Sequence, residues 1–289
     1  MTHNFSRRLL NHALIRFWIV TAVVGVTLAT SQLAGAELRY TAKVYDLDSN
    51  KDKVLYTYRS ESVEKGDGLL VTNETKYPDG KLALHEEISF RKDESVSLIK
   101  VVQTQINAEG TIEIGDGKAK FTYTKDGKTK TETRDAGSDF IVGSQIPLII
   151  AANWEKLMRG EKLKRRLAVV DRLDDFAFEY TKDREETFEG KKHVIIKMKP
   201  GSIFVSAIVS PLYFYMSADG KTLHEVRGRT TVKRDDGGKF KDLDAIIVYE
   251  KGPSISAASA AAGAPAAEAA APGAKPEANQ KPASGGNSK

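Results

Sequence analysis

Residues 38–45 read Leu38-Arg39-Tyr40-Thr41-Ala42-Lys43-Val44-Tyr45 and set the fold class. Every second side chain of this segment is apolar, and most of the side chains between them are polar. Successive side chains of a β-strand point to opposite faces, so the alternation predicts a strand with one buried and one solvated face. Similar runs follow at residues 54–58, 82–90, 96–106, 119–123, 163–170, 176–180, 193–198, 212–216, 223–232 and 245–249.

Short turn sequences separate many of these runs. They contain Gly, Asp, Asn, Ser and Pro, which adopt positive φ or hydrogen-bond to their own backbone at a tight reversal. Strands joined by such turns pair as antiparallel neighbours, so the sequence predicts an antiparallel meander. The turns are Asp48-Ser49-Asn50, Pro78-Asp79-Gly80, Asp116-Gly117 and Asp126-Gly127.

One segment, from Ser144 to Arg159, has apolar residues at helical spacing instead. Pro147 suits the first turn of a helix, and Gly160 suits the position after the last turn. The segment therefore predicts one amphipathic helix with a wide apolar face. Residues 202–209 are nearly uncharged and fit either a short helix or a buried strand.

The expected fold class is mainly β with minor α. Roughly a dozen strands favour a strongly curved antiparallel sheet, a half-barrel or a barrel, because so long an open sheet tends to curl or close. The amphipathic helix is expected to pack on the concave side. An outer-membrane barrel is the rival fold, but the strands are densely charged and often shorter than the ~10 residues that a span needs.

The N-terminus has the layout of a secretory signal peptide. A basic region ends near Arg16, an apolar stretch runs over residues 17–30, and Ala34-Gly35-Ala36 predicts cleavage before Glu37. An uncleaved membrane anchor is disfavoured because the apolar run is shorter than the ~20 residues of a spanning helix. Residues 6–10 also leave the twin-arginine export route open. We expect a periplasmic or secreted protein that is not an integral membrane protein after cleavage.

The C-terminal segment differs sharply in composition from the rest of the chain. From Gly252 onward it is rich in Ala, Pro, Ser and Gly. Such a segment buries too little apolar area to offset the entropy of ordering it, which predicts disorder. The expected organisation is a signal peptide at 1–36, one β-rich domain at 37–251 and a disordered tail at 252–289, either a spacer or a solubilising extension.

Charge and cysteine content exclude several function classes. The net charge is +5, but Arg7, Arg8 and Arg16 belong to the signal peptide, and the other basic residues are interleaved with acidic ones. This pattern describes a mixed-charge surface and argues against a nucleic-acid partner. The chain has no cysteine, which excludes disulfides, thiolate metal sites and cysteine nucleophiles.

Three segments carry a resemblance to a family. They are Asn153-Trp154-Glu155-Lys156-Leu157 with Gly160-Glu161, then Val170-Asp171-Arg172-Leu173-Asp174, then residues 213–228. The chain resembles an uncharacterised family of exported proteobacterial β-rich proteins. In plan it is more distantly similar to the periplasmic half-barrel lipoprotein carriers and to mycobacterial lipid-binding lipoproteins. The resemblance implies a fold and no established activity.

The residues that commonly carry catalysis or bind metals form no familiar pattern. His85, His193 and His224 each lie alone in a predicted strand, without metal-ligand spacing. No nucleophile elbow, phosphate loop or dinucleotide fingerprint occurs. The sequence therefore predicts no catalytic residue, no metal site and no cofactor.

Two acidic clusters have a functional and a plainer interpretation. Residues 46–52 place oxygen ligands as a calcium loop does, but Lys51 and Thr57 replace the Gly and Glu that such a loop needs, which favours a hairpin turn. Asp171, Asp174 and Asp175 could supply a glycosidase-like acid and base. We expect them instead to face water beside Arg172.

The apolar residues leave one candidate site. If the helix faces a curved sheet, its apolar face and the residues opposite could line a cavity for a lipid or another hydrophobic ligand. An ordinary packed core is the preferred interpretation of such a stripe. The candidate ligand-binding residues are Ile150, Trp154, Leu157, Phe204, Ile208 and Phe214.

Three function classes remain. The first is a non-catalytic carrier of a hydrophobic ligand in the cell envelope, which needs a cavity. The second is a structural or interaction module that binds an envelope protein, which needs only a solid core. The third is an enzyme without a recognisable motif, which needs a polar cleft with perturbed carboxylates. The order of preference is the order given.

Overall fold

The structure, a computed structural model, describes residues 40–188, 190–202 and 209–250. The predicted signal peptide, the predicted tail and most of the ambiguous segment 202–209 lie outside these residues. The described strands form one 15-stranded sheet. The first eight strands are β1 (Tyr40–Asp46), β2 (Tyr56–Lys65), β3 (Gly68–Lys76), β4 (Leu82–Phe90), β5 (Val96–Gln103), β6 (Ala108–Gly115), β7 (Lys118–Lys125) and β8 (Lys128–Asp135).

The remaining strands follow the helical region. They are β9 (Phe140–Ile141), β10 (Leu163–Val169), β11 (Asp174–Phe188), β12 (Lys191–Pro200), β13 (Leu212–Ser217), β14 (Leu223–Asp236) and β15 (Lys239–Tyr249). The helical elements are η1 (Thr104–Ile106), η2 (Gly143–Gln145), α1 (Ile146–Ala152), α2 (Trp154–Met158) and η3 (Val170–Arg172).

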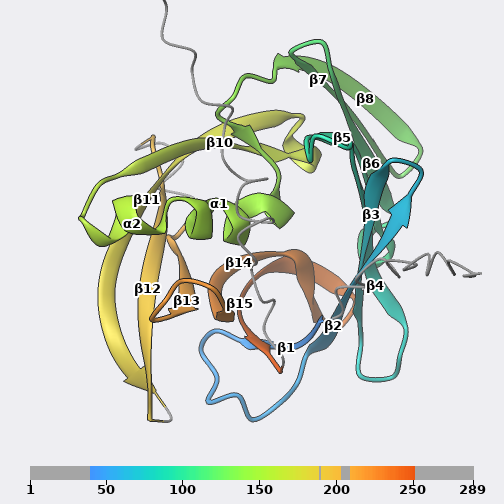
Figure 1. Cartoon of the computed structure of the whole chain (residues 1–289). Helices are drawn as coiled ribbons and strands as arrows, with labels where there is room; N and C mark the ends of the chain where they lie inside the picture. The colour runs from blue at the N-terminus through green and yellow to red at the C-terminus, as the bar shows by residue number, and fades with distance from the viewer. Residues whose placement is uncertain (1–39, 189, 203–208, 251–289) are drawn as a thin grey trace, which may run out of the picture. The chain divides into compact units, whose positions relative to one another are not determined.

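The sheet is a meander whose two ends are joined. Its strand order is β8-β7-β6-β5-β4-β3-β2-β1-β15-β14-β13-β12-β11-β10-β9. The pairs are antiparallel except for β9 with β10, which is parallel. The edge strands β8 and β9 are consecutive in sequence, so only residues 136–139 separate the two edges. In Figure 1 the sheet curves so that β10 to β12 and β3 to β8 lie on opposite sides of α1.

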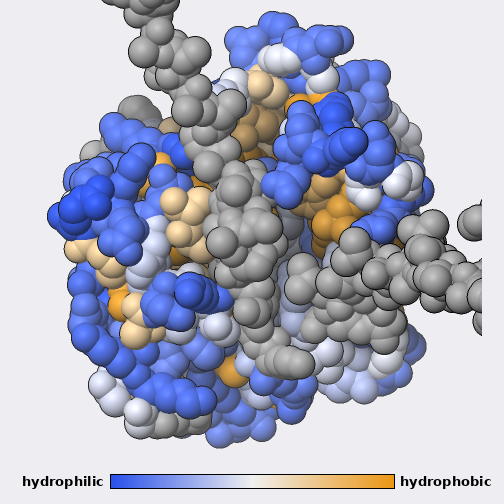
Figure 2. All heavy atoms as spheres, viewed as in Figure 1, coloured by the Kyte–Doolittle hydropathy of each residue, from blue (hydrophilic) through white to orange (hydrophobic). Residues whose placement is uncertain are grey.

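The predicted mainly β fold with a strongly curved antiparallel sheet is confirmed. The hairpin turns use the predicted chemistry: φ is 50° and 68° at Asp116 and Gly117, and 50° and 73° at Asp126 and Gly127. Two positive φ values in a two-residue loop match the right-handed twist of the flanking strands. Figure 2 shows that the outer surface of the viewed face is mostly hydrophilic, as alternating strands require.

The predicted single helix is divided in two. Asn153 is buried, lies at φ −111° and ψ 20° between α1 and α2, and its Nδ2 donates to the carbonyl of Ile149 at 2.9 Å. Such a side chain competes with the helix for a backbone acceptor, which explains the break. The predicted end at Gly160 is confirmed, since φ there is +83° and its N–H donates to Leu157 O at 3.0 Å.

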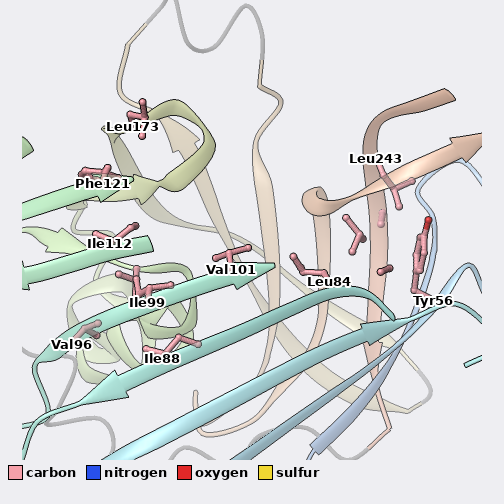
Figure 3. Close-up of a cluster of buried hydrophobic side chains, with 14 of the residues drawn as sticks. Tyr56, Leu84, Ile88, Val96, Ile99, Val101, Ile112, Phe121, Leu173 and Leu243 are labelled. Carbon is pink, nitrogen blue, oxygen red and sulfur yellow. The ribbon is translucent and has the colours of Figure 1, made fainter. Parts of the chain in front are cut away.

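The interior contains two separate clusters of buried hydrophobic side chains. The first cluster lies mainly on β1 to β7, β14 and β15. Figure 3 labels residues of this cluster from several of these strands, together with Leu173, which follows η3. The second cluster lies between α1, α2 and strands β10 to β14. The largest buried side chains of the two include Phe121 and Leu243 in the first, and Tyr180, Ile196 and Met216 in the second.

Ion pairs connect β8 and the segment that follows it to β10 and β11. We call this region the seam. Arg134 of β8 donates from Nε to Asp174 of β11 at 2.8 Å. Arg166 of β10 donates from Nε to both oxygens of Asp139 at 3.0 and 3.1 Å, and from Nη1 to Asp175 at 2.9 Å. These side-chain contacts therefore fix the segment between β8 and β9 to β10 and β11.

The seam corrects one expectation from the sequence. Asp171 is exposed beside Arg172, as expected, but Asp174 and Asp175 are paired with arginines. The side chain of Asp175 is only 8% exposed. The sheet curls far enough to bring Arg134, distant in sequence, to Asp174 at the start of β11. Arg166 reaches Asp175 from the neighbouring strand β10. Because these carboxylates are occupied by structural ion pairs, the pattern differs from that of a glycosidase acid and base.

We predict that Arg166→Ala lowers the free energy of unfolding by about 2 kcal/mol or more, because it leaves the buried carboxylate of Asp175 without its partner. Urea unfolding followed by the fluorescence of Trp154 measures the change. Arg159→Ala is the matched control: Arg159 is 59% exposed beside Glu161, and its loss is expected to cost below about 0.5 kcal/mol. Equal effects of the two substitutions would contradict a structural role for the seam.

Candidate ligand cavity

A cavity of about 750 Å³ lies between the two hydrophobic clusters. Its walls come from both: Ile88, Ile99 and Ile112 belong to the first cluster, and Phe178 and Met198 to the second. A volume of several hundred Å³ with a mostly apolar lining is typical of small-molecule sites. Figure 2 shows apolar residues in the recesses of the viewed face, behind a hydrophilic outer surface.

Strand register produces the apolar wall. Ile88 of β4 lies opposite Ile99 of β5, and Ile99 lies opposite Ile112 of β6. We call these three residues the isoleucine row. Residues that face one another across antiparallel strands point to the same side of the sheet. The row therefore presents a continuous branched aliphatic surface to the cavity.

A second set of residues, which we call the polar row, crosses the same wall beside the isoleucine row, two residues earlier along β4. Tyr40 of β1 lies opposite Ser60 of β2, Ser60 opposite Asn73 of β3, and Asn73 opposite Glu86 of β4. Tyr40, Asn73 and Glu86 line the cavity. Asn73 and Ser60 are buried, with exposed fractions of 5% and 1%. The sheet thus places polar groups side by side on its concave face, where a core would normally be apolar.

The polar row is not fully hydrogen-bonded. Asn73 Nδ2 donates a long hydrogen bond to Glu86 Oε2 at 3.5 Å. The other amide atom, Asn73 Oδ1, is buried and has no hydrogen-bond partner within the described residues. Among those residues no basic side chain forms an ion pair with Glu86. The half-buried carboxyl of Glu86 has its pKa raised by desolvation, with Asn73 opposing the shift.

Two further tyrosines, Tyr58 and Tyr249, lie beside Tyr40 of the polar row. The ring centroids of Tyr40 and Tyr58 are 6.2 Å apart, those of Tyr40 and Tyr249 5.9 Å, and those of Tyr58 and Tyr249 6.5 Å. All three line the cavity. Burial raises the pKa of each hydroxyl, so these groups remain protonated at neutral pH. They provide neutral hydrogen-bonding groups beside Glu86.

Charged residues also reach the cavity from β14 and β15. Asp242 accepts from Arg229 Nη1 at 2.6 Å and from Lys233 Nζ at 2.8 Å. The irregular part of β14 that carries them is held by Gln105 of η1, whose Nε2 donates to Lys233 O at 3.0 Å and whose Oε1 accepts from Lys233 N at 2.9 Å. Arg229 Nε also donates to Asp244 at 2.7 Å, so two carboxylates balance the two cations of this group, unlike the carboxyl of Glu86.

The candidate residues chosen from the sequence lie elsewhere. Ile150, Trp154, Leu157 and Phe214 come together in the second cluster, and Ile150 and Leu157 have no exposed surface. None of these four is among the described residues that line the cavity. Phe204 and Ile208 lie outside the described residues.

Close packing explains this arrangement. A Cβ at Gly220, where φ is +72°, would lie 2.2 Å from the Trp154 ring, so the turn and the ring are in direct contact. The apolar face of α1 and α2 is thus covered by β11 to β14, and only the start of the helical region, at Val142, Ser144 and Pro147, reaches the cavity.

The histidines differ from the expectation that each lies alone. The rings of His193 and His224 are 4.8 Å apart on β12 and β14, because both strands are adjacent to the short strand β13. His193 is buried, and its Nδ1 has no hydrogen-bond partner within the described residues. Burial and His193 lower the pKa of His224. Within residues 40–188, 190–202 and 209–250, no group of three or more His, Asp or Glu could hold a metal ion.

The acidic segment 46–52 forms the connection between β1 and β2. Asp46 Oδ1 accepts from Asp48 N at 3.0 Å, and Ser49 Oγ donates to Asp46 O at 2.8 Å. Asp46 also forms an ion pair with Arg234. Its oxygens therefore bind within the protein, and the interpretation of the segment as a turn is confirmed.

Comparison with known proteins gives structural likenesses alone. No protein-family model matches the chain, and no curated protein matches it significantly. One similar solved structure is a β-barrel-like protein of Domain of Unknown Function DUF1849 from Brucella abortus. It has 10% identity and a TM-score of 0.43, and the match covers 75% of this chain and 97% of that one.

Two further structures have lower TM-scores. A putative outer membrane lipoprotein-sorting protein domain from Vibrio parahaemolyticus has 10% identity, a TM-score of 0.22 and coverage of 74% and 83%. A DUF1329 family protein from Desulfovibrio piger has 11% identity, a TM-score of 0.22 and coverage of 76% and 87%. At such identities these structures assign no ligand, activity or location to this chain.

In the part of the chain that the structure describes, no helix combines the length and the apolar character needed to cross a membrane.

We predict that Glu86→Gln stabilises the protein at neutral pH. The pKa of Glu86 is raised above its ordinary value of 4.5, so above that value the folded state binds more protons than the unfolded state, and the free energy of unfolding falls as the pH rises. Glutamine removes this penalty. The variant should be more stable than the wild type at pH 7.5, with the difference disappearing below about pH 4.

Urea unfolding at the two pH values measures this difference. Glu87→Gln, on the opposite face of β4 beside His85, is the control and should give no such gain at pH 7.5. A Glu86→Gln protein that is equally stable or less stable at pH 7.5 would contradict the assignment of Glu86 as an uncompensated carboxyl.

Proposed function

We propose that this chain is an exported, non-catalytic binding protein of the cell envelope that carries a hydrophobic or lipid ligand in the cavity between its two clusters. The observation that supports this function is the cavity itself, about 750 Å³ between two buried hydrophobic clusters. Well-packed proteins leave few spaces larger than a water molecule. A structural or interaction module, the alternative function, has no need of so large an apolar space.

The chemistry of the lining favours binding over catalysis. The described lining residues include many Ile, Val, Leu and Phe side chains. Of the charged lining groups besides Glu86, Arg229 and Lys233 are paired with Asp242, and Glu109, Asp171 and Arg172 are exposed. Glu86 is hydrogen-bonded in the polar row to Asn73. The hydroxyls of the row, Tyr40 and Ser60, have no hydrogen bond to a second acid or to a base among the described residues. General acid-base or nucleophilic catalysis needs at least one such partner in reach.

The proposed location rests on the N-terminal sequence. Residues 1–36 have the composition of a cleavable export signal. An exported carrier would work in the periplasm or outside the cell, where an insoluble ligand must be shielded from water. An apolar cavity inside a sheet with a charged outer surface can shield such a ligand and needs no catalytic group to do so.

The test is binding of N-phenyl-1-naphthylamine, an uncharged apolar probe that fluoresces in apolar surroundings, to the full exported chain. We expect a Kd in the micromolar range. Ala168→Phe places a large ring at a half-buried position that lines the cavity, so it should weaken binding about tenfold or more. Ala177→Phe makes the same change at an exposed position on β11 and should leave the Kd unchanged.

Both variants are first compared with the wild type by circular dichroism and thermal unfolding, to confirm that they fold. Absence of saturable probe binding to the wild type would contradict the carrier function. So would equal affinities of the wild type and a folded Ala168→Phe protein.

A further inference from the structure

We propose that the cavity selects amphiphiles whose head is a primary ammonium group, which Glu86 and Asn73 bind while the isoleucine row contacts the alkyl chain. The proposal rests on the carrier function and names the chemical class of its ligand. It is based on the geometry of the polar row and on two acceptors in it: Asn73 Oδ1, which has no hydrogen-bond partner among the described residues, and the carboxylate of Glu86, which has no cationic partner among them.

The pairing of the strands fixes the position of the polar row. Its four residues lie directly opposite one another on four neighbouring strands, so neighbours are about 5 Å apart. Glu86 is therefore held in place by strand register and not by a mobile loop. A ligand head at this level would meet Glu86 and Asn73 together.

The row has unused acceptors. Asn73 Oδ1 is buried without a hydrogen-bond partner within the described residues, and Glu86 accepts only the long 3.5 Å hydrogen bond from Asn73 Nδ2. A buried acceptor without a donor costs free energy of about 1–3 kcal/mol. An ammonium group has three donors and no acceptor. It can therefore bind Asn73 Oδ1 and Glu86 at once.

The charge of the head group distinguishes an ammonium amphiphile from one with a hydroxyl or carboxylate head. Within the described residues, Glu86 has no cationic partner, whereas Asp242 is paired with Arg229 and Lys233. The other two acids of the described lining, Glu109 and Asp171, are exposed. A bound ammonium group supplies the missing opposite charge, and charge-assisted hydrogen bonds are about twice as strong as neutral ones. A hydroxyl head can donate one hydrogen bond but leaves the charge uncompensated. A carboxylate head adds a second negative charge, which the first repels.

The apolar part of the ligand has a matching surface. Glu86 and Ile88 are two residues apart on the same face of β4, a distance of about 6.6 Å along the strand. The isoleucine row begins at Ile88 and continues across β5 and β6. An alkyl chain attached to a head at Glu86 would therefore extend along this row, which also explains why polar and apolar rows lie next to each other on one wall.

Competition against bound N-phenyl-1-naphthylamine tests the selectivity. The full chain loaded with the probe is titrated at pH 7.5 with dodecylamine, 1-dodecanol and laurate, which share a chain length and differ in the head. Each is kept below its critical micelle concentration. We expect dodecylamine to compete at least tenfold more strongly than dodecanol, and laurate to be the weakest competitor.

Two variants assign the selectivity to Glu86. Glu86→Gln should abolish the preference for the amine over the alcohol, measured as the ratio of the two competition constants within the variant. Circular dichroism and thermal unfolding report that the variant is folded. Glu87→Gln carries the same substitution on the other face of β4 and should keep the wild-type preference.

The outcomes separate the two proposals. If the probe binds but the three competitors are equal, or if Glu86→Gln keeps the preference for dodecylamine, the ammonium selectivity is wrong and the carrier function stands. If the probe itself does not bind, the carrier function and the selectivity both fail.

Discussion

Antiparallel pairing of β1 with β15 is the constraint on which the rest of the structure depends. Val44 lies opposite Ile247, and both side chains point to the interior. This pairing joins the two ends of the meander, so a 15-stranded sheet has its edges at β8 and β9, in the middle of the sequence. Twisted sheets of that length curl, and here the curl brings the edges together at the seam.

A sheet curled in this way encloses more space than one core fills. The first half of the strands packs around the first cluster, and the second half packs around α1 and α2 in the second cluster. The second cluster is closely packed, as the contact between Gly220 and Trp154 shows. The space that neither cluster fills is the cavity. The proposed binding site thus lies where two cores on one sheet do not merge, and the polar row places hydrogen-bonding groups along one wall of that space.

Sequence alone predicted the curved antiparallel sheet, the hairpin turns and the helical region, because each depends on local periodicity or turn chemistry. It missed β8, whose residues are almost all exposed and polar, because an edge strand needs no apolar face. It also missed β3, where the interior positions are Asn73 and Thr75 and not apolar side chains. Pairing with neighbouring strands, which is not local, overrides propensity in both cases.

The site was predictable only through an exception to the pattern. Leu84, Glu86 and Ile88 alternate with outward-facing residues in β4, so the carboxyl of Glu86 occupies a position that the pattern assigns to the core. A violation of this kind often marks a functional site. The apolar helical stripe with Ile150 and Trp154 follows the pattern of a core helix. It is closely packed in the second cluster, which is the preferred interpretation of such a stripe. The ion pairs at the seam depend on closure of the whole sheet, which no local signal encodes.

The central claim is that two packed clusters leave an apolar cavity between them, and a crystal structure of the protein under xenon pressure tests it most directly. Xenon enters apolar cavities and gives a strong anomalous signal. The account predicts anomalous peaks bounded by the isoleucine row and by Phe178 and Met198 of the opposite wall. Side chains that fill this space, or xenon only beneath α1 and α2 beside Ile150 and Trp154, would contradict it.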